Sequence, residues 1–381
     1  MKVATLLYKK NAFIKETNTD NLQYNTVQLV LGFGLGKLIT DKKSFETLQS
    51  KFPNATICLS STAGEIFDIE VFEDTISIVA ISFSSSYIKT ALVNIQDIES
   101  SFEAGKKLVN QLPKENLKLI FILSDGGKVN GSELVKGLNF DLNKEVLITG
   151  GLAGDGAKFE HTFVGLNAIP QSGNIVAIGF YGEKIQLSHG SLGGWESFGL
   201  EREVTKSKNN VLYEIDHKNA LDLYKTYLGK YAKDLPGSAL LFPLSLTFSD
   251  NQDSIVRTIL SIDEANQSLT FAGDIPEGSK VKLMKANFDG LIDASSEAAS
   301  ICLSMNELES PKLAILISCV GRKLVLGNRI SEEVEAVREI FGTKTTLTGF
   351  YSYGEISPLQ PFTNCELHNQ TMTITCIDEI E

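Results

Sequence analysis

The stretch that decides the fold is KLAILISC (312–319), followed by SEEVEAVREIF (331–341) and TLTGFYSYGE (346–355). The first and last segments open as apolar runs typical of buried strands, whereas the middle segment has apolar residues at helical spacing. A strand, a helix and a second strand in succession indicate a parallel crossover in an α/β fold. The second strand leads through a glycine and a short loop into a Gly-acid pair, Gly354 and Glu355.

The same order of elements occurs earlier in the chain. A Ser-capped helix, SSFEAGKKLVNQL (100–112), precedes the apolar strand KLIFILSD (118–125). The helix SELVKGL (132–138) and the strand VLITGG (146–151) follow, and the strand leads into LAGD. In the later copy a helix at 295–308 stands before the first strand, and corresponding elements lie between 194 and 200 residues apart. Offsets this constant indicate an internal repeat.

The correspondence extends to the flanking strands. The run NIVAIGF (174–180) after the first copy corresponds to TMTITCI (371–377) after the second. Before the helices, two further pairs of strands correspond, and they are ISIVAISF (76–83) with QSLTFAGDI (267–275) and IKTALVNI (88–95) with KVKLMKAN (280–287). Alternating runs joined by turn residues indicate antiparallel pairs beside the parallel crossovers.

We therefore expect an α/β fold of mixed sheets covered by helices, with two similar lobes from an internal duplication. The predicted lobes are residues 1–205 and 206–381. Near the join, REVTKSKNNVLYEID predicts a hairpin turning at Asn209 and Asn210, and a helix is expected from about 219 to 228. Each lobe then has the size of an ordinary α/β domain.

A third Gly-acid element lies in TICLSSTAGEI (56–66), where Gly64 and Glu65 follow an apolar strand. Glycine at a strand end permits positive φ and lets amide groups converge on a ligand. The acids Glu65, Asp155 and Glu355 are therefore candidate ligand-binding residues. The alternative interpretation is a structural turn in which the acid accepts hydrogen bonds from backbone N–H groups.

The segment 347–358 carries bulky residues where a turn would have small polar ones. Tyr351 and Tyr353 are expected to form the walls of a small-molecule pocket, with core packing as the alternative. Arg322 ends the neighbouring strand and would bind a carboxylate, while Glu355 would bind an ammonium group, so the pair suits a zwitterion such as an amino acid. Arg257 is a second candidate for the anionic group. The alternative is a salt bridge between Arg322 and Glu355.

Composition limits the partners of the chain. Its 381 residues carry a formal charge of −12, which disfavours nucleic acid and anionic membrane surfaces. The N-terminal residues do not resemble a signal peptide, and the apolar runs are shorter than the ~20 residues that a membrane helix needs. Five scattered cysteines without CxxC spacing favour free thiols. The expected location is the cytoplasm.

Catalytic and metal-binding motifs do not stand out. The chain has no GxSxG elbow and no HExxH motif, and its four histidines are not at metal-ligand spacing. We expect no metal site and no enzymatic activity; the alternative is an enzyme of unrecognised type whose turnover depends on Glu355 or on the thiol of Cys319. A haem iron needs a single axial histidine, and His189 and His368 are the candidates.

These residues together resemble the FIST-domain family, with an N-terminal and a C-terminal FIST module in succession. The motifs that carry the resemblance are SSTAGEI (60–66), GGLAGD (150–155), the stretch around NVLYEID (210–216), FPL (242–244) ahead of Arg257, SCVGR (318–322), and GFYSYGEISP (349–358) with LHNQTMTI behind it. Leu59 and Ser60 stand where the first motif of the family usually has Gly and Cys.

The resemblance implies a cytoplasmic sensory protein that binds an amino acid or a similar small metabolite and signals through a separate partner. Implied partners are a histidine kinase or a cyclic-dinucleotide enzyme. Some stand-alone members of the family resemble haem proteins that sense nitric oxide, so haem is the alternative ligand. The ligand-binding residues expected on this basis are Arg257, Arg322, Tyr351, Tyr353, Glu355, Asp155 and Glu65.

Overall fold

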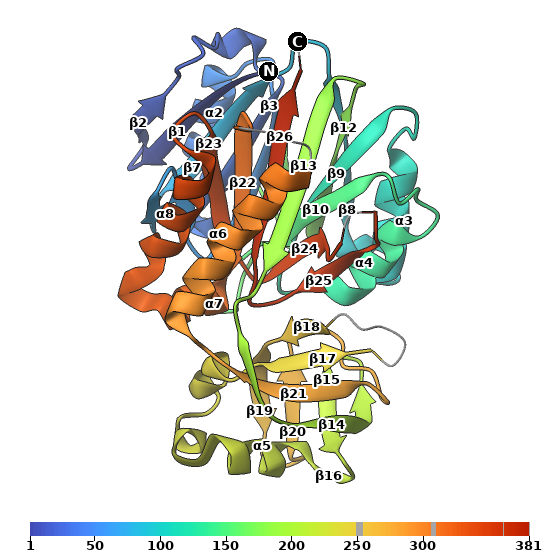
Figure 1. Cartoon of the computed structure of the whole chain (residues 1–381). Coiled ribbons are helices and arrows are strands. Elements are labelled where there is room, and N and C mark those ends of the chain that lie inside the picture. Colours follow the sequence, from blue (N-terminus) through green and yellow to red (C-terminus); the bar gives the residue numbers. More distant parts are fainter. Residues whose placement is uncertain (249–253, 306–309, 361, 381) are drawn as a thin grey trace.

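A computed structural model describes residues 1–248, 254–305, 310–360 and 362–380. Within these residues the strands form three six-stranded sheets and one eight-stranded sheet. Figure 1 shows that the three six-stranded sheets and their helices make up a body, and that the fourth sheet forms a separate layer beside it. None of the described helices is long and apolar enough to cross a membrane.

The first sheet has the order β11-β4-β3-β7-β1-β2. Its strands are β1 (Lys2–Lys9), β2 (Ala12–Thr17), β3 (Leu29–Gly34), β4 (Thr56–Ser61), β7 (Ile76–Ser82) and β11 (Val164–Leu166). Strands β3 and β4 are parallel, and the other neighbours are antiparallel. The crossover between them contains α1 (Gly36–Ile39) and α2 (Lys42–Lys51), and α2 begins where Asp41 accepts a hydrogen bond from the Ser44 amide.

The second sheet has the order β25-β24-β10-β9-β12-β8. Its strands are β8 (Tyr87–Asn94), β9 (Leu117–Ser124), β10 (Leu147–Leu152), β12 (Asn174–Tyr181), β24 (Gly354–Pro358) and β25 (Cys365–His368). Strands β9 and β10 are the parallel pair, joined by α4 (Gly131–Asn139). Helix α3 (Ser101–Gln111) precedes β9 and packs beside α4, and the side chains of Ser100 and Asn130 cap the two helices.

The third sheet has the order β13-β26-β22-β23-β5-β6. Its strands are β5 (Glu65–Phe67), β6 (Glu70–Phe72), β13 (Ile185–Leu192), β22 (Leu313–Cys319), β23 (Thr346–Ser352) and β26 (Met372–Glu379). Strands β22 and β23 are the parallel pair, joined by α7 (Val320–Leu326) and α8 (Ile330–Phe341). Helix α6 (Phe288–Met305) packs on β13, β26 and α8.

The three sheets repeat one pattern, and each contains one or two strands that follow the parallel pair of another sheet. In every sheet a parallel strand pair lies beside an antiparallel strand, which is β7, β12 or β26. After its parallel pair the chain passes into another sheet: β5 follows β4 into the third sheet, β11 follows β10 into the first, and β24 follows β23 into the second. The repeat seen in the sequence therefore has a third copy, and a cyclic exchange of strands links the three.

The exchange encloses an apolar core between the sheets. Leu31 and Phe33 of β3, Phe121 of β9, Ile315 of β22 and Phe350 of β23 are fully buried in this core. The rings of Phe33 and Phe350 stack with their centroids 4.8 Å apart. Complete burial of each such side chain contributes about 1.5–3 kcal/mol, so the interior holds the three sheets together. Helices cover the outer faces through other apolar clusters.

A subdomain of residues 196–285 is inserted between β13 and α6. Its strands and helix are β14 (Glu196–Lys208), β15 (Val211–Ile215), β16 (Lys218–Asn219), β17 (Leu244–Thr247), β18 (Ser254–Arg257), β19 (Ile259–Asp263), β20 (Ser268–Phe271), β21 (Lys280–Lys285) and α5 (Ala220–Leu228). Among the described residues, the subdomain also holds the 3₁₀ helices η3 (Gly229–Asp234) and η4 (Gly237–Leu241), while η1 (Tyr24–Thr26), η2 (Ile95–Asp97) and η5 (Gly327–Arg329) lie in the body. The subdomain has its own apolar core and lies below the body in Figure 1.

The structure confirms the expected α/β class, with mixed sheets covered by helices. The hairpin at Asn209, where φ is 53°, joins β14 to β15, and α5 follows as expected. One part of the predicted correspondence is wrong. The segments 267–275 and 280–287 belong to the inserted subdomain, because their strands β20 and β21 pair there, and β13 takes the position that β8 has in the second sheet. The proposed lobe boundary at 205/206 falls within β14.

Candidate ligand-binding site

The three strand-to-loop elements meet at one point of the body. The amide of Ala63 donates to the Tyr351 carbonyl at 2.8 Å, that of Gly154 to the Ser61 carbonyl at 3.0 Å, and that of Tyr353 to the Leu152 carbonyl at 3.2 Å. Each element thus donates to another in a closed ring. The predicted Gly-acid elements are therefore brought together, and their loops satisfy one another's backbone groups.

Two of the acids have the same surroundings. Glu65 accepts hydrogen bonds from the Thr62 hydroxyl at 2.7 Å and from the Thr75 hydroxyl at 2.7 Å. Glu355 accepts from the Ser352 hydroxyl at 2.5 Å and from the Thr371 hydroxyl at 2.9 Å. In both cases a hydroxyl three residues earlier and a distant threonine hold the carboxyl group. Burial raises the pKa of Glu65 to about 7 and that of Glu355 to about 8, against the opposing effect of these hydrogen bonds.

The third acid, Asp155, caps a loop instead. Its carboxylate accepts from the backbone amides of Phe159, Glu160 and His161 at 2.8–3.1 Å. The Tyr353 hydroxyl also donates to Asp155, and the Phe159 ring stacks on the Tyr353 ring with centroids 4.4 Å apart. Tyr353 is thus placed by the loop that Asp155 organises. This matches the alternative interpretation of the element, in which the acid caps a turn.

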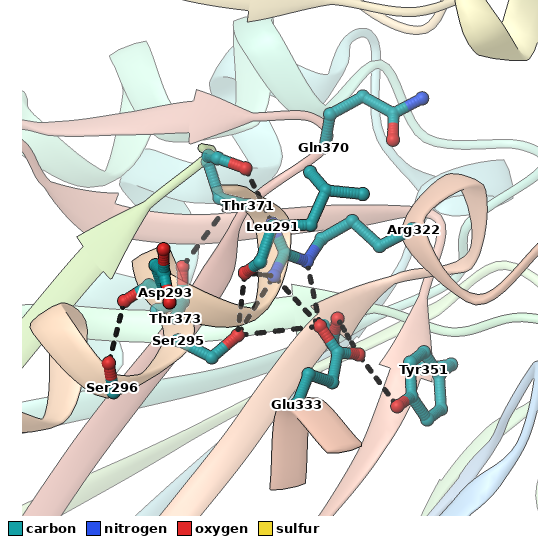
Figure 2. A network of polar contacts seen from close by, with 12 residues as sticks. Leu291, Asp293, Ser295, Ser296, Arg322, Glu333, Tyr351, Gln370, Thr371 and Thr373 are labelled. Carbon is teal, nitrogen blue, oxygen red and sulfur yellow. Dashed lines mark hydrogen bonds and ion pairs between the residues drawn. The ribbon is translucent and has the colours of Figure 1, made fainter. Parts of the chain in front are cut away.

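Arg322 is fully buried and pairs with Glu333 of α8, not with Glu355. Its Nε and Nη2 donate to Glu333 Oε2 at 3.0 and 2.8 Å. The other Glu333 oxygen accepts from the Tyr351 hydroxyl at 2.7 Å and from the Ser318 hydroxyl at 3.0 Å. Figure 2 shows Arg322 and Tyr351 directed at this one carboxylate. The Arg322–Glu355 salt bridge that the sequence offered as an alternative is therefore wrong.

The same guanidinium fastens both chain segments that lead to the inserted subdomain. Arg322 Nη1 donates to the Gly193 carbonyl, just after β13, at 2.6 Å. Nη2 donates to the Leu291 carbonyl and the Ser295 hydroxyl of α6, at 2.7 and 2.8 Å. Because its donors are all directed at protein groups, Arg322 acts in the structure as an anchor for the two connections.

Arg257 differs, although it is also buried, with 2% of its surface exposed. Its hydrogen bonds to described residues go to main-chain carbonyls only: Leu367 at 2.8 Å, Asp274 at 3.2 Å and Val256 at 3.4 Å. Burial lowers its pKa to about 10, while the charges of Glu366 and Asp274 act in the opposite direction. This guanidinium has no carboxylate hydrogen-bonded to it among the described residues, so it retains the capacity to bind an anion.

Unpartnered polar atoms lie on both sides of this junction between body and subdomain. On the subdomain side the Thr258 hydroxyl is buried without a partner among described residues. On the body side both side-chain polar atoms of Gln370 are buried without one. The Gln370 amide packs on Gly321, where a Cβ would lie 2.3 Å from its nitrogen, and the indole of Trp195 donates to the Gln370 carbonyl at 2.9 Å. Figure 2 shows Gln370 outside the network of dashed lines.

The two candidate haem ligands differ in availability. Both histidines are buried, which lowers the pKa of each to about 4 and keeps both rings neutral. His368 Nε2 is bonded to the Ser357 carbonyl at 2.9 Å. His189 Nδ1 has no partner among described residues, and His189 lines a cleft. Of the two, His189 is the one that borders this cleft.

Cys319 is buried, and burial raises the pKa of its thiol, so the thiolate form is disfavoured at neutral pH. Among the described residues no three His, Cys, Asp or Glu side chains are grouped so that they could hold a metal ion. The predicted ligand-binding residues thus divide into a body group, whose polar side chains are hydrogen-bonded to protein groups, and Arg257 at the junction.

The sequence analysis did not predict Glu333, Thr258 or Gln370 as polar residues at the junction between body and subdomain. Glu333 lies in an amphipathic helix, where an acid would ordinarily face solvent. The available signal is its position four residues before Val337 and eight before Phe341, on the buried face of α8. Gln370 lies in the LHNQTMTI motif, whose positive φ of 64° at this residue is unusual outside glycine.

Comparison with known proteins shows two matches to family models along the chain. The FIST N domain matches residues 28–218, and the FIST C domain matches residues 220–358. An uncharacterized protein of Methanocaldococcus jannaschii, MJ1623, is 24% identical over 360 residues, with 82% of this chain and 66% of that protein covered. This chain therefore spans just under two thirds of that relative.

Among solved structures, a cyanuric acid hydrolase from A. caulinodans aligns over 100% of both chains with a TM-score of 0.38 and 7% identity. A likeness this weak carries no argument about the reaction or the ligand of the present chain.

Proposed function

The chain belongs to the FIST family, whose domains are associated with small-ligand sensing in signal transduction, and from this premise we propose that it is a cytoplasmic, non-catalytic sensor of an amino acid or a similar small metabolite. Both family matches together extend over most of the chain. The ligand class, the location and the absence of catalysis are part of the proposal.

The observation that carries the proposal is that Arg257 is buried and has no carboxylate hydrogen-bonded to it among the described residues. A buried guanidinium that meets only carbonyl oxygens is an unusual arrangement, because buried charges are normally paired. Next to it in the chain is the unpartnered Thr258 hydroxyl, and across the junction is the unpartnered Gln370 amide. These groups supply a cation, a hydroxyl, and an amide donor and acceptor. In this proposal the carboxylate of an amino acid binds Arg257, and Thr258 and Gln370 are the candidate partners for its other polar groups.

The geometry also suggests how binding would be transmitted. The subdomain is joined to the body by two chain segments, and Arg322 holds both of them. Thr258 N contacts Asn369 Oδ1 at 3.5 Å, so the two sides of the junction already touch. A ligand bound between them would change the position of the subdomain relative to the body. In this proposal a histidine kinase or a cyclic-dinucleotide enzyme binds the protein and responds to the changed position of the subdomain.

Direct ligand contacts by Arg322, Tyr351, Tyr353, Glu355, Asp155 and Glu65 stay predictions. The polar atoms of these residues are engaged with protein groups in the structure. We expect substitutions among them to alter ligand binding through the shape of the body and the two connections.

The proposal is tested by thermal unfolding of the protein with each of the twenty amino acids in turn. A ligand that binds the folded state raises the midpoint in proportion to its concentration over Kd. We expect one class of amino acid to raise it, and the rise to disappear in Arg257→Lys and Thr258→Val. The control Arg338→Lys changes an arginine of α8 that pairs with Asp68 at the surface and should keep the rise. If no amino acid raises the midpoint, the amino-acid assignment fails.

A further inference from the structure

A cleft of about 510 Å³ lies on the body beside β13, the edge strand of the third sheet. Its volume lies in the usual range for small-ligand sites, about 300–1,000 Å³. The cleft is bordered by β13 of the third sheet and by the starts of β9 and β10 of the second. The residues that line it are Lys118, Lys144, Glu145, Val146, Leu147, Ile185, Gln186, Leu187, His189, Met305, Pro358, Phe362 and Thr363.

His189 is the polar group at the buried part of this lining, with 4% of its surface exposed. Its ring donates to the main-chain carbonyl of Pro358, and its Nδ1 has no partner among the described residues. The nitrogen bonded to the carbonyl is therefore Nε2, which carries the proton, and Nδ1 is a lone-pair acceptor. A buried acceptor without a donor is unfavourable, and a ligand with an O–H or N–H group would supply the missing hydrogen bond.

Charge and apolar surface are separated around the cleft. Ile185, Leu187 and Val146 provide apolar surface beside the histidine. Lys144 is exposed and forms no ion pair with a described residue, while Lys118 is 3.8 Å from Glu183 in a loose exposed pair. The one acid in the lining, Glu145, is hydrogen-bonded to Asn143. In a chain of net charge −12, two lysines and one acid in the lining of a cleft that also has apolar surface favour an anionic ligand.

We propose that this cleft binds an amphipathic organic acid: a compact apolar or aromatic body with one O–H or N–H donor directed at His189 Nδ1 and a carboxylate at Lys118 and Lys144. The site is separate from the Arg257 junction, since the two share no lining residue, and it goes beyond the proposed amino-acid sensing. It needs no chemical step.

The test uses three related probes in isothermal titration calorimetry with the full chain. 4-Hydroxyphenylacetate has the donor, the ring and the carboxylate. Phenylacetate lacks the donor, and tyramine replaces the carboxylate with a cation. We expect 4-hydroxyphenylacetate to bind at one site, phenylacetate to bind about tenfold more weakly, and tyramine not to bind. Equal binding of the first two probes, or tighter binding of tyramine, would overturn the proposal.

Variants locate the binding. His189→Phe removes the acceptor and keeps a ring, so 4-hydroxyphenylacetate should bind about tenfold more weakly. His161→Phe is the matched control at an exposed histidine and should bind as the wild type does. Lys144→Gln is an exposed change that leaves folding intact and should weaken binding and reduce its salt dependence. Arg257→Lys should leave this binding unchanged.

Two results would contradict the assignment directly. One is saturable binding of 4-hydroxyphenylacetate that both His189→Phe and Lys144→Gln leave unaltered, because the probe then binds elsewhere. The other is a Soret band after addition of haem that His189→Phe abolishes, because His189 would then ligate iron and the cleft would belong to haem.

Discussion

Arg322 and Arg257 are both buried close to the place where the inserted subdomain joins the body, yet their partners differ. Arg322 meets a carboxylate, two carbonyls and a hydroxyl, and the carboxylate of Glu333 is itself saturated by Tyr351 and Ser318. Arg257 meets three carbonyls. A buried charge with a complete set of partners stabilises structure, whereas one without a counter-charge in contact remains able to bind a ligand.

The largest effect should come from breaking the complete network. Glu333→Ala leaves the Arg322 guanidinium buried without its counter-charge, so we expect a loss of about 3–5 kcal/mol in the free energy of unfolding. Urea denaturation followed by circular dichroism measures it. The matched control is Glu332→Ala, the preceding residue of α8, whose ion pair with Arg329 is exposed and worth about 0–1 kcal/mol. Equal losses in the two variants would mean that the buried ion pair stabilises the fold no more than the exposed ion pair does.

A smaller effect is expected at the other arginine. Arg257→Met removes a buried charge that has no carboxylate in contact, but it leaves the Leu367 carbonyl without its donor. We expect a loss of about 1–3 kcal/mol, measured by the same denaturation. A loss as large as that of Glu333→Ala would remove the distinction between the two arginines and with it the argument that Arg257 is reserved for a ligand.

The pH dependence sharpens the comparison on the Arg322 side. Burial raises the pKa of Glu355 to about 8, although Arg322 opposes the shift, so the folded state holds a proton that the unfolded state releases above about pH 4.5. The stabilisation is therefore complete below pH 4.5 and is lost as the pH rises towards 8. In Glu355→Gln the decline in stability should be shallower than in the wild type by up to about 1.4 kcal/mol per pH unit. Identical slopes, measured by urea denaturation from pH 5 to 8, would mean that Glu355 is ionised throughout.

The smallest effect concerns the contact between Trp195 and Gln370. Trp195→Phe keeps an aromatic ring against Met284 and Leu291 but removes the donor to the Gln370 carbonyl. We expect a loss of about 1 kcal/mol, and greater protease sensitivity of the connection at 193–195. The control Trp195→Leu removes both the donor and the ring and should cost more. If Trp195→Phe unfolds like the wild type, this hydrogen bond does not secure the junction.

Much of the body could be predicted from the sequence because its signals are local. The buried strands β9 and β22 are long apolar runs, and α3, α4 and α8 have clear caps or a clear apolar face. The positions of the elements expected at 118–125 and 312–319 agree with the structure within one residue at each end.

The exchange of strands could not be predicted, because β5 and β11 are three residues long and nothing within them specifies a partner sheet. The partner of Arg322 was missed for a related reason. Glu355 follows a strand next to the one that leads to Arg322, so it looks available, whereas Glu333, although nearer in the chain, lies in an amphipathic, charged helix. Its spacing from Val337 and Phe341 is the one sequence signal for the inward direction, and the packing of α8 against α6 confirms it.

The strand exchange has a consequence for how the protein is made. Strand β5 emerges early from the ribosome, but its neighbour β23 follows about 280 residues later. Until then β5 can pair only with β6, and its other edge has no partner; exposed edges of this kind favour association with other nascent chains. We therefore expect folding during translation to pause at an incomplete body and to finish only after β23 and β26 have left the ribosome.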